Sequence, residues 1–101
     1  MESKFTILLL PRAYRDIEEI YVYIASTLAG PDIALKLVHT FEKAIFSLEY
    51  MPLRGALRKT GIYADKGYRQ LIVDNFIVLY RVELGKKQVV IITVKYSKRL
   101  F

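Results

Sequence analysis

Residues 68–96, YRQLIVDNFIVLYRVELGKKQVVIITVKY, contain three apolar runs that are separated by two turn signals. Asp74-Asn75 stands between the first and second runs, and both residue types tolerate the positive φ of a two-residue hairpin. Gly85 marks the second break, and the run after it is rich in β-branched residues. The stretch therefore predicts an antiparallel meander with strands at residues 68–73, 76–83 and 88–96.

The two turns also predict which residues lie opposite each other in the meander. They place Arg69 opposite Tyr80, and Arg81 opposite Val90. Because side chains alternate between the two faces of a sheet, Arg69 and Arg81 are expected on opposite faces.

Strict alternation along the last strand extends this prediction to the end of the meander. Lys95 is expected on the face of Arg69, whereas Val94 and Tyr96 are expected on the face of Arg81. Both faces are largely apolar. One is therefore expected to take helices, and the other to form a groove or a partner surface.

The N-terminal half has the pattern of one strand followed by two helices. Residues 5–10 form a mainly apolar run that ends at Pro11. Apolar residues then recur at three- and four-residue spacing over residues 17–28 and 35–48, with Gly30-Pro31 between them. Pro11 and Pro31 are each expected in the first turn of a helix, where their missing N–H is not needed. The order is thus β-α-α-β-β-β. It predicts a single α+β domain over residues 1–101, with a helical hairpin packed on a mainly antiparallel sheet.

Composition excludes several classes of chemistry. The chain has no cysteine, which rules out disulfides, a thiol nucleophile and a zinc–thiolate site. One histidine and scattered carboxylates give no metal-ligand spacing, and there is no Gly-rich phosphate loop, so neither a metal nor a cofactor is expected. The apolar runs are too short for a signal peptide or a membrane span, which favours a cytoplasmic protein with no membrane partner.

Charge is divided unevenly along the chain. Residues 1–53 hold five Lys/Arg and seven Asp/Glu, a net charge of −2, whereas residues 54–101 hold eleven and three, a net charge of +8. Such separation suggests a positive surface for a polyanion or an acidic protein, the alternative being a basic surface that serves solubility.

Several short motifs follow one another in a particular order. They are Pro11-Arg12-Ala13, Asp16-Ile17-Glu18-Glu19-Ile20, Tyr23-Ile24-Ala25, Met51-Pro52, Arg54-Gly55, Gly67-Tyr68-Arg69, Asn75-Phe76 and Val78-Leu79-Tyr80-Arg81-Val82. With this order and spacing, nearly the whole chain resembles the RelE/ParE toxin superfamily, the toxins of type II toxin–antitoxin pairs.

The resemblance implies a partner and a choice between two activities. Members are neutralised by an acidic antitoxin whose flexible segment wraps the toxin in a hetero-oligomeric complex, which agrees with a basic half and spare apolar surface. RelE-type members cut messenger RNA on the ribosome with a set of Lys and Arg side chains, often with a Tyr or His. ParE-type members lack this set and poison DNA gyrase.

Carried over position by position, the cleavage set is incomplete in this chain. Arg69 matches the basic residue after the tyrosine of the first meander strand, but Leu71 and Ile77 stand where two further cations are implied. The last basic residue of the set falls on Lys98, Arg99 or Ser97. Each missing cation would cost about 3 kcal/mol of transition-state stabilisation. This favours the ParE-like branch.

The candidate site residues come from the basic C-terminal half. Candidate contacts with the target or antitoxin are Arg54, Arg58, Tyr68, Arg69, Tyr80, Arg81, Lys95, Lys98 and Arg99. For RNA cleavage, the candidate catalytic residues are Arg69, Arg81, Tyr96, Lys98 and Arg99. Tyr14 and Tyr21, at helical spacing, are expected to pack in the domain or to contact the antitoxin.

Each main candidate also has a structural alternative. Arg81 is suited to an ion pair with Glu83 or a helix carboxylate, Arg69 to stacking on Tyr80, and Tyr96 to packing in the sheet. Three functions remain open at this point. They are a gyrase-binding toxin, a ribosome-dependent endoribonuclease, and an inactive member that binds only an antitoxin or an operator complex.

Overall fold

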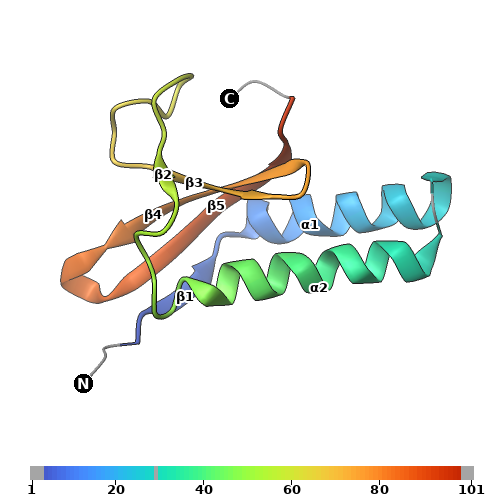
Figure 1. Cartoon of the computed structure of the whole chain (residues 1–101), viewed down its shortest axis with the longest axis horizontal. Coiled ribbons are helices and arrows are strands. Elements are labelled where there is room, and N and C mark those ends of the chain that lie inside the picture. Colours follow the sequence, from blue (N-terminus) through green and yellow to red (C-terminus); the bar gives the residue numbers. More distant parts are fainter. Residues whose placement is uncertain (1–3, 29, 99–101) are drawn as a thin grey trace.

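The computed structural model describes residues 4–28 and 30–98, which form a five-stranded sheet and a hairpin of two helices (Figure 1). The predicted α+β class is therefore confirmed. In chain order the elements are β1 (Thr6–Leu9), α1 (Pro11–Tyr23), the π-helical segment η1 (Ile24–Leu28), α2 (Pro31–Ser47), β2 (Ala56–Leu57), β3 (Arg69–Val73), β4 (Phe76–Glu83), the 3-10 turn η2 (Leu84–Lys86) and β5 (Gln88–Tyr96). Within the described residues, no helix has the length and apolar character needed to cross a membrane.

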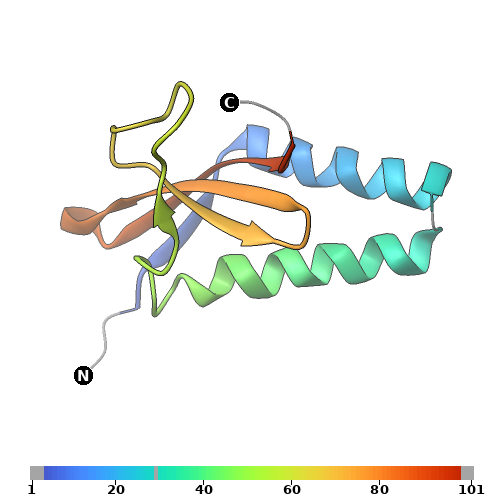
Figure 2. The same cartoon turned by 45° about the horizontal axis from the view of Figure 1, so that its top comes forward.

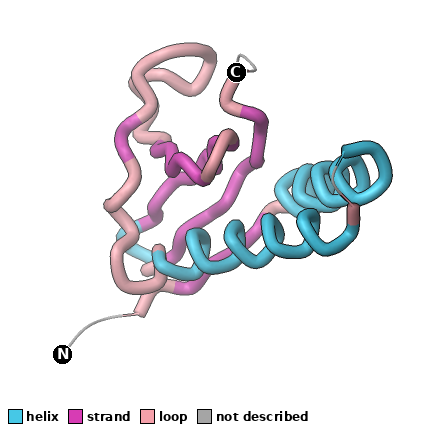
Figure 3. Tube along the Cα trace, turned by 45° about the vertical axis from the view of Figure 1, so that its right-hand side comes forward, coloured by secondary structure: helices cyan, strands magenta, loops and turns pink. Residues whose placement is uncertain are grey.

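Proline starts both helices, as the sequence predicts. Pro11 and Pro31 each occupy the first turn, where the missing N–H has no intrahelical partner to lose. Gly30 adopts φ 93° between the helices, a conformation that glycine tolerates and most residues do not. Figure 1 shows the two helices running side by side, and Figure 3 shows both of them on the same side of the strands.

The sheet has the strand order β1-β5-β4-β3-β2 (Figure 2). β1 pairs with β5 in parallel, and the other pairs are antiparallel. Arg69 lies opposite Tyr80, and Arg81 lies opposite Val90, so both predicted registers are confirmed. Asp74 adopts φ 53° in the predicted turn.

The prediction for the second half of β5 is wrong. A register shift between Leu79 and Tyr80 lets Tyr80 face Ile91 while Leu79 faces Thr93, which leaves one extra residue on β5. The extra residue reverses the alternation beyond it. Val94 therefore joins the core beneath the helices, and Lys95 lies opposite Ile77 on the other face.

The main core lies between the helices and the sheet. Phe41, Ile45 and Leu48 on α2 pack with residues such as Val78 and Ile91 of the sheet, all of them at most 2% exposed. Each buried side chain of this size contributes about 1.5–3 kcal/mol relative to an exposed one.

The opposite face of the sheet is covered by the chain itself. Leu79, Val90 and Ile92 form a second buried cluster there, and Tyr63 and Tyr68 pack on it. The rings of the two tyrosines meet edge to face with centroids 4.9 Å apart. The sequence predicted a groove or a partner surface on this face. The loop that carries Tyr63 instead covers part of it. Its neighbour β2 is too short for the sequence pattern to have predicted it.

Asp16 ties α1 to the exposed edge of β5. β1 ends at Leu9, so β5 continues beyond it without that neighbour. There the Asp16 carboxylate accepts hydrogen bonds from the Thr93 hydroxyl and from the Val94 N–H, the latter at 3.1 Å. Lys95 Nζ lies 3.4 Å from the second carboxylate oxygen. A side chain of the helix therefore takes the place of a strand.

Candidate partner-binding surfaces

Three of the predicted contact arginines lie around the segment after α2. Arg54 donates to the Ser47 hydroxyl at 2.6 Å, and Arg58 donates to the Gln70 side chain at 2.6 Å. Arg69 donates to the carbonyl of Gly55 at 2.7 Å. These guanidinium groups hold the chain's own loop, which limits their freedom to contact a partner.

Tyr80 holds the same loop from the core. Its ring is fully buried, its hydroxyl donates to the Pro52 carbonyl at 2.9 Å, and it accepts the Gly55 N–H at 2.9 Å. Burial raises the pKa of the Tyr80 phenol above its ordinary 10.0, against the opposing effects of the Gly55 N–H and of Arg69 and Arg54. The predicted contact of Tyr80 with a partner is wrong for this conformation, because no part of the ring reaches the surface.

The remaining candidates lie elsewhere on the fold. Arg81 is on the face opposite Arg69, where its Nε lies 3.1 Å from the Glu83 carboxylate. Tyr68 packs on the second cluster, and Lys95 pairs with Asp16. The structural alternative for Arg81 thus holds in this conformation, and Arg69, Arg81 and Lys95 do not form one cationic patch.

The end of β5 carries the last candidates. Tyr96 is 41% exposed and packs against Phe76, with ring centroids 5.7 Å apart. It lies beside Phe76 rather than on the face of Arg81 that the sequence predicted, because of the extra residue in β5. Lys98 is exposed, and Arg99 lies outside the described residues.

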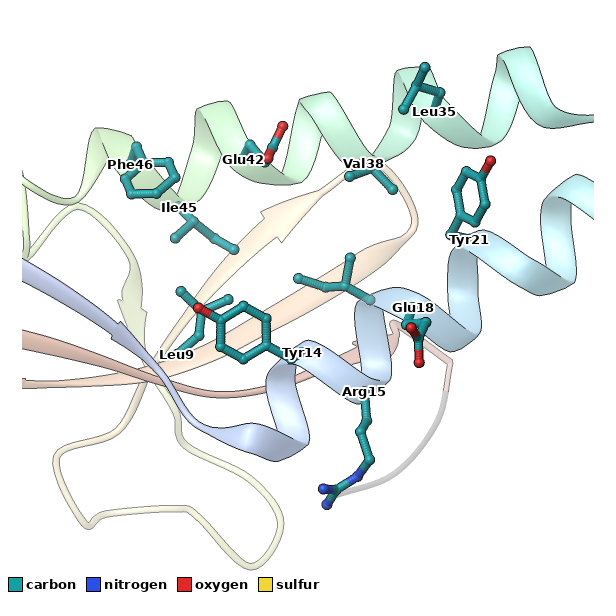
Figure 4. A pocket seen from close by; sticks show the side chains of 11 residues that line it. Leu9, Tyr14, Arg15, Glu18, Tyr21, Leu35, Val38, Glu42, Ile45 and Phe46 are labelled. Carbon is teal, nitrogen blue, oxygen red and sulfur yellow. The ribbon is translucent and has the colours of Figure 1, made fainter.

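A groove between α1 and α2 is the main surface that contains none of the predicted site residues. It has a volume of about 590 Å³ and is lined mainly by apolar side chains. The lining residues are Leu9, Tyr14, Arg15, Ile17, Glu18, Tyr21, Leu35, Val38, Glu42, Ile45 and Phe46. Figure 4 shows Tyr14 and Ile45 pointing into the space between the helices, whereas the guanidinium of Arg15 points away from α2. Tyr14 is 63% exposed and Phe46 is 49% exposed, so large apolar side chains meet solvent here.

The sequence held a partial signal for this groove. Tyr14 and Tyr21 were expected to pack or to contact an antitoxin, and both line it. Leu35 and Phe46 gave a further signal, since α2 has more large apolar residues than its buried stripe needs. Among the described residues, no cluster of His, Asp and Glu could hold a metal ion.

Comparison with known families decides what kind of protein carries these surfaces. The sequence matches the family model for the ParE toxin of the type II toxin–antitoxin system parDE over residues 7–101. The chain belongs to the ParE toxin family. A comparison of this ParE toxin with curated proteins by sequence finds no match.

Solved structures show the same fold. A chain of the chromosomal ParDE system of P. aeruginosa has a TM-score of 0.76 and 24% identity, with 94% of this ParE toxin and 98% of that chain covered. A chain of the RelBE2 toxin–antitoxin complex of Mycobacterium tuberculosis has a TM-score of 0.64 and 23% identity, with coverage of 95% and 94%. The YoeB/ParE toxin of Agrobacterium tumefaciens has a TM-score of 0.61 and 16% identity, with coverage of 91% and 98%. At these identities the likeness concerns the fold.

Proposed function

We propose that this ParE-family toxin inhibits growth by binding DNA gyrase, and that a cognate acidic antitoxin neutralises it in a hetero-oligomeric complex. The observation that carries the proposal is the family match over residues 7–101. Gyrase acts on DNA in the cytoplasm, so the toxin is proposed to act there.

The placement of the cations supports a binding mechanism over RNA cleavage. Arg69 and Arg81 lie on opposite faces of the sheet, where they could not stabilise one phosphate together. Leu71 and Ile77, at two positions where the cleavage set implies cations, are buried apolar residues. Arg69 would also have to leave the Gly55 carbonyl before it could bind a phosphate.

A supercoiling assay tests the proposed target. Purified toxin, added at micromolar concentration to gyrase and relaxed plasmid, is expected to inhibit supercoiling. Toeprinting on translating ribosomes with the same preparation is expected to show no cuts within codons. Normal supercoiling together with cuts within codons would replace the proposal with the endoribonuclease function. Normal supercoiling without cuts, in cells that also grow normally when the chain is produced, would indicate an inactive member.

The groove between α1 and α2 is the surface that we propose the antitoxin covers. An amphipathic segment can bury its apolar side against Tyr14, Leu35 and Phe46 while its polar side faces solvent. Burial of this exposed apolar surface would supply the main driving force of association.

Substitutions at exposed groove positions test this assignment without disturbing the core. Tyr14→Ser and Phe46→Ser are expected to weaken binding of the antitoxin encoded beside the toxin and to prevent it from rescuing growth. Tyr50→Ser is the matched control, because Tyr50 is a large exposed residue outside the groove lining. Equal antitoxin affinity for the groove variants and the control would show that the antitoxin binds elsewhere.

A further inference from the structure

On the other side of α1 lies a second hollow, between the helix and the end of β5. It has a volume of about 680 Å³, and its lining includes Asp16, Glu19 and Tyr23 of α1, Phe76 of β4, and Lys95 and Tyr96 of β5. Figure 2 shows the end of β5 running beside the first turns of α1. We call this site the α1–β5 hollow.

Aromatic rings form much of the apolar lining of the hollow. Phe76 packs edge to face on Phe41 in the core with centroids 5.3 Å apart, and Tyr96 packs on Phe76 in turn. This row of rings runs from the core to the surface and fixes Tyr96 from one side. Tyr23 is 58% exposed in the same lining. The faces of aromatic rings carry partial negative charge, which attracts cations and disfavours anions.

The ionised side chains of the hollow leave one negative charge without a counter-charge. Lys95 and Asp16 neutralise each other at 3.4 Å, and Asp16 is also satisfied by Thr93 and Val94. Glu19 has no ion-pair partner among residues 4–28 and 30–98. The ionised side chains that line the hollow therefore sum to a charge of −1, although the chain as a whole carries a net charge of +6.

We propose that the α1–β5 hollow binds an arginine side chain of a protein partner. A carboxylate would be repelled by Glu19 and by the ring faces, and an aliphatic side chain would leave Glu19 partly desolvated without a partner. A guanidinium meets both requirements, since its flat face stacks on an aromatic ring while its N–H groups donate to a carboxylate. The site is distinct from the groove proposed for the acidic antitoxin, and the inference holds whether or not gyrase is the target.

Titration of isotope-labelled 101-residue chain with short peptides, followed by the backbone amide signals in NMR, tests the inference. The probes are the capped peptides Gly-Arg-Gly, Gly-Gln-Gly and Gly-Leu-Gly. The arginine peptide is expected to shift the amide signals of Glu19, Tyr23 and Tyr96 in a saturable way. The glutamine and leucine peptides should bind at least about fivefold more weakly, because they lack the cation. Signals of Leu35 and Phe46 in the α1–α2 groove should stay unchanged.

Paired variants separate the charge from the shape of the hollow. Glu19→Gln is expected to weaken arginine-peptide binding several-fold, and Tyr96→Ala should do the same. Glu18→Gln, which alters the adjacent residue on the groove side of α1, should leave it unchanged. If Tyr96→Ala fails to fold, Tyr23→Ala tests the aromatic lining at a more exposed position.

Three outcomes would overturn the proposal. One is the absence of a saturable shift with the arginine peptide. Another is equal binding of the leucine peptide, which would make the hollow a general apolar site. The third is arginine-peptide affinity that survives Glu19→Gln unchanged.

Discussion

Replacing Asp16 with alanine should loosen α1 from the sheet more than any exposed substitution on that helix. The change removes the acceptor for the Thr93 hydroxyl and for the Val94 N–H, and it leaves Lys95 without its counter-charge. A hydrogen bond to a charged group contributes about 1.5–3 kcal/mol, and an unsatisfied buried donor costs about as much. Lys95 keeps partial access to water, so its ion pair adds little.

The expected sum is a fall of about 3–4 kcal/mol in the free energy of unfolding. Domains of this size have a total of about 5–15 kcal/mol, so the variant should be close to the limit of folding. Its melting temperature should fall by at least about 12 °C. Asp16→Asn should lose roughly half as much free energy, because the amide keeps one acceptor oxygen for two donors.

Urea unfolding followed by circular dichroism measures these losses directly. Glu18→Ala is the matched control, since Glu18 is an exposed carboxylate on the same helix. Its effect should stay within about 0.5 kcal/mol of zero. A double-mutant cycle with Thr93→Val should give a coupling energy of at least about 1 kcal/mol. If Asp16→Ala and Glu18→Ala unfold at the same urea concentration, the Asp16 carboxylate does not hold α1 on the sheet.

Three further predictions concern Tyr80 and the turns around it. Tyr80→Phe leaves the Gly55 N–H and the Pro52 carbonyl without their partner, so urea unfolding should show a loss of about 1–3 kcal/mol; an unchanged midpoint would contradict the role of the hydroxyl. Gly55→Ala should also destabilise the fold in the same assay, because an added Cβ would lie 2.6 Å from the Gln70 carbonyl oxygen and from the Tyr80 hydroxyl; wild-type stability would show that the loop yields freely. Because the pKa of Tyr80 is raised in the folded state, the neutral phenol is favoured there. Its contribution is fully present below the unfolded pKa of about 10 and is lost as pH rises through the folded value, so the drop in unfolding free energy at alkaline pH should shrink in Tyr80→Phe.

Local signals were sufficient for most of the fold. Turn residues between apolar runs gave the bounds of β4 and β5, and Pro11 and Pro31 gave the starts of both helices. The hairpin register followed from the position of Asp74, whose conformation the turn requires. These features depend on residues that are close in sequence, so a pattern of a few residues is enough to predict them.

The extra residue in β5 could not be predicted in this way. The run from Val89 to Val94 is apolar or β-branched at every position, so no polar residue marks which side chains face solvent. Beyond the shift, Thr93 and Val94 donate hydrogen bonds to Asp16, which lies 77 residues before Thr93 in sequence. The face of Lys95 therefore depends on tertiary packing, and the sequence-based assignment of that residue was wrong.

The site residues were chosen from the basic half of the chain because of its net charge, and that choice also overlooked contacts within the fold. The basic half has a net charge of +8. However, Arg54, Arg58 and Arg69 donate hydrogen bonds within the chain, around the segment after α2. Arg81 forms an ion pair with Glu83. The number of cations determines the long-range electrostatic field of the protein. A direct contact with a partner also needs a side chain that can reach that partner. The apolar groove between α1 and α2 lies instead in the half of the chain whose net charge is negative.

Helix α1 separates the two surfaces for which partners are proposed. Glu18 lines the groove shared with α2, and Glu19, the next residue, lines the hollow shared with β5. Successive residues on a helix point about 100° apart, so one helix can form a wall of both sites without sharing a side chain between them. The apolar side of an amphipathic segment suits the first site, and a cationic side chain suits the second. The toxin could therefore hold both at once, provided that α1 keeps its place on the sheet, which is the role that the bonds of Asp16 perform.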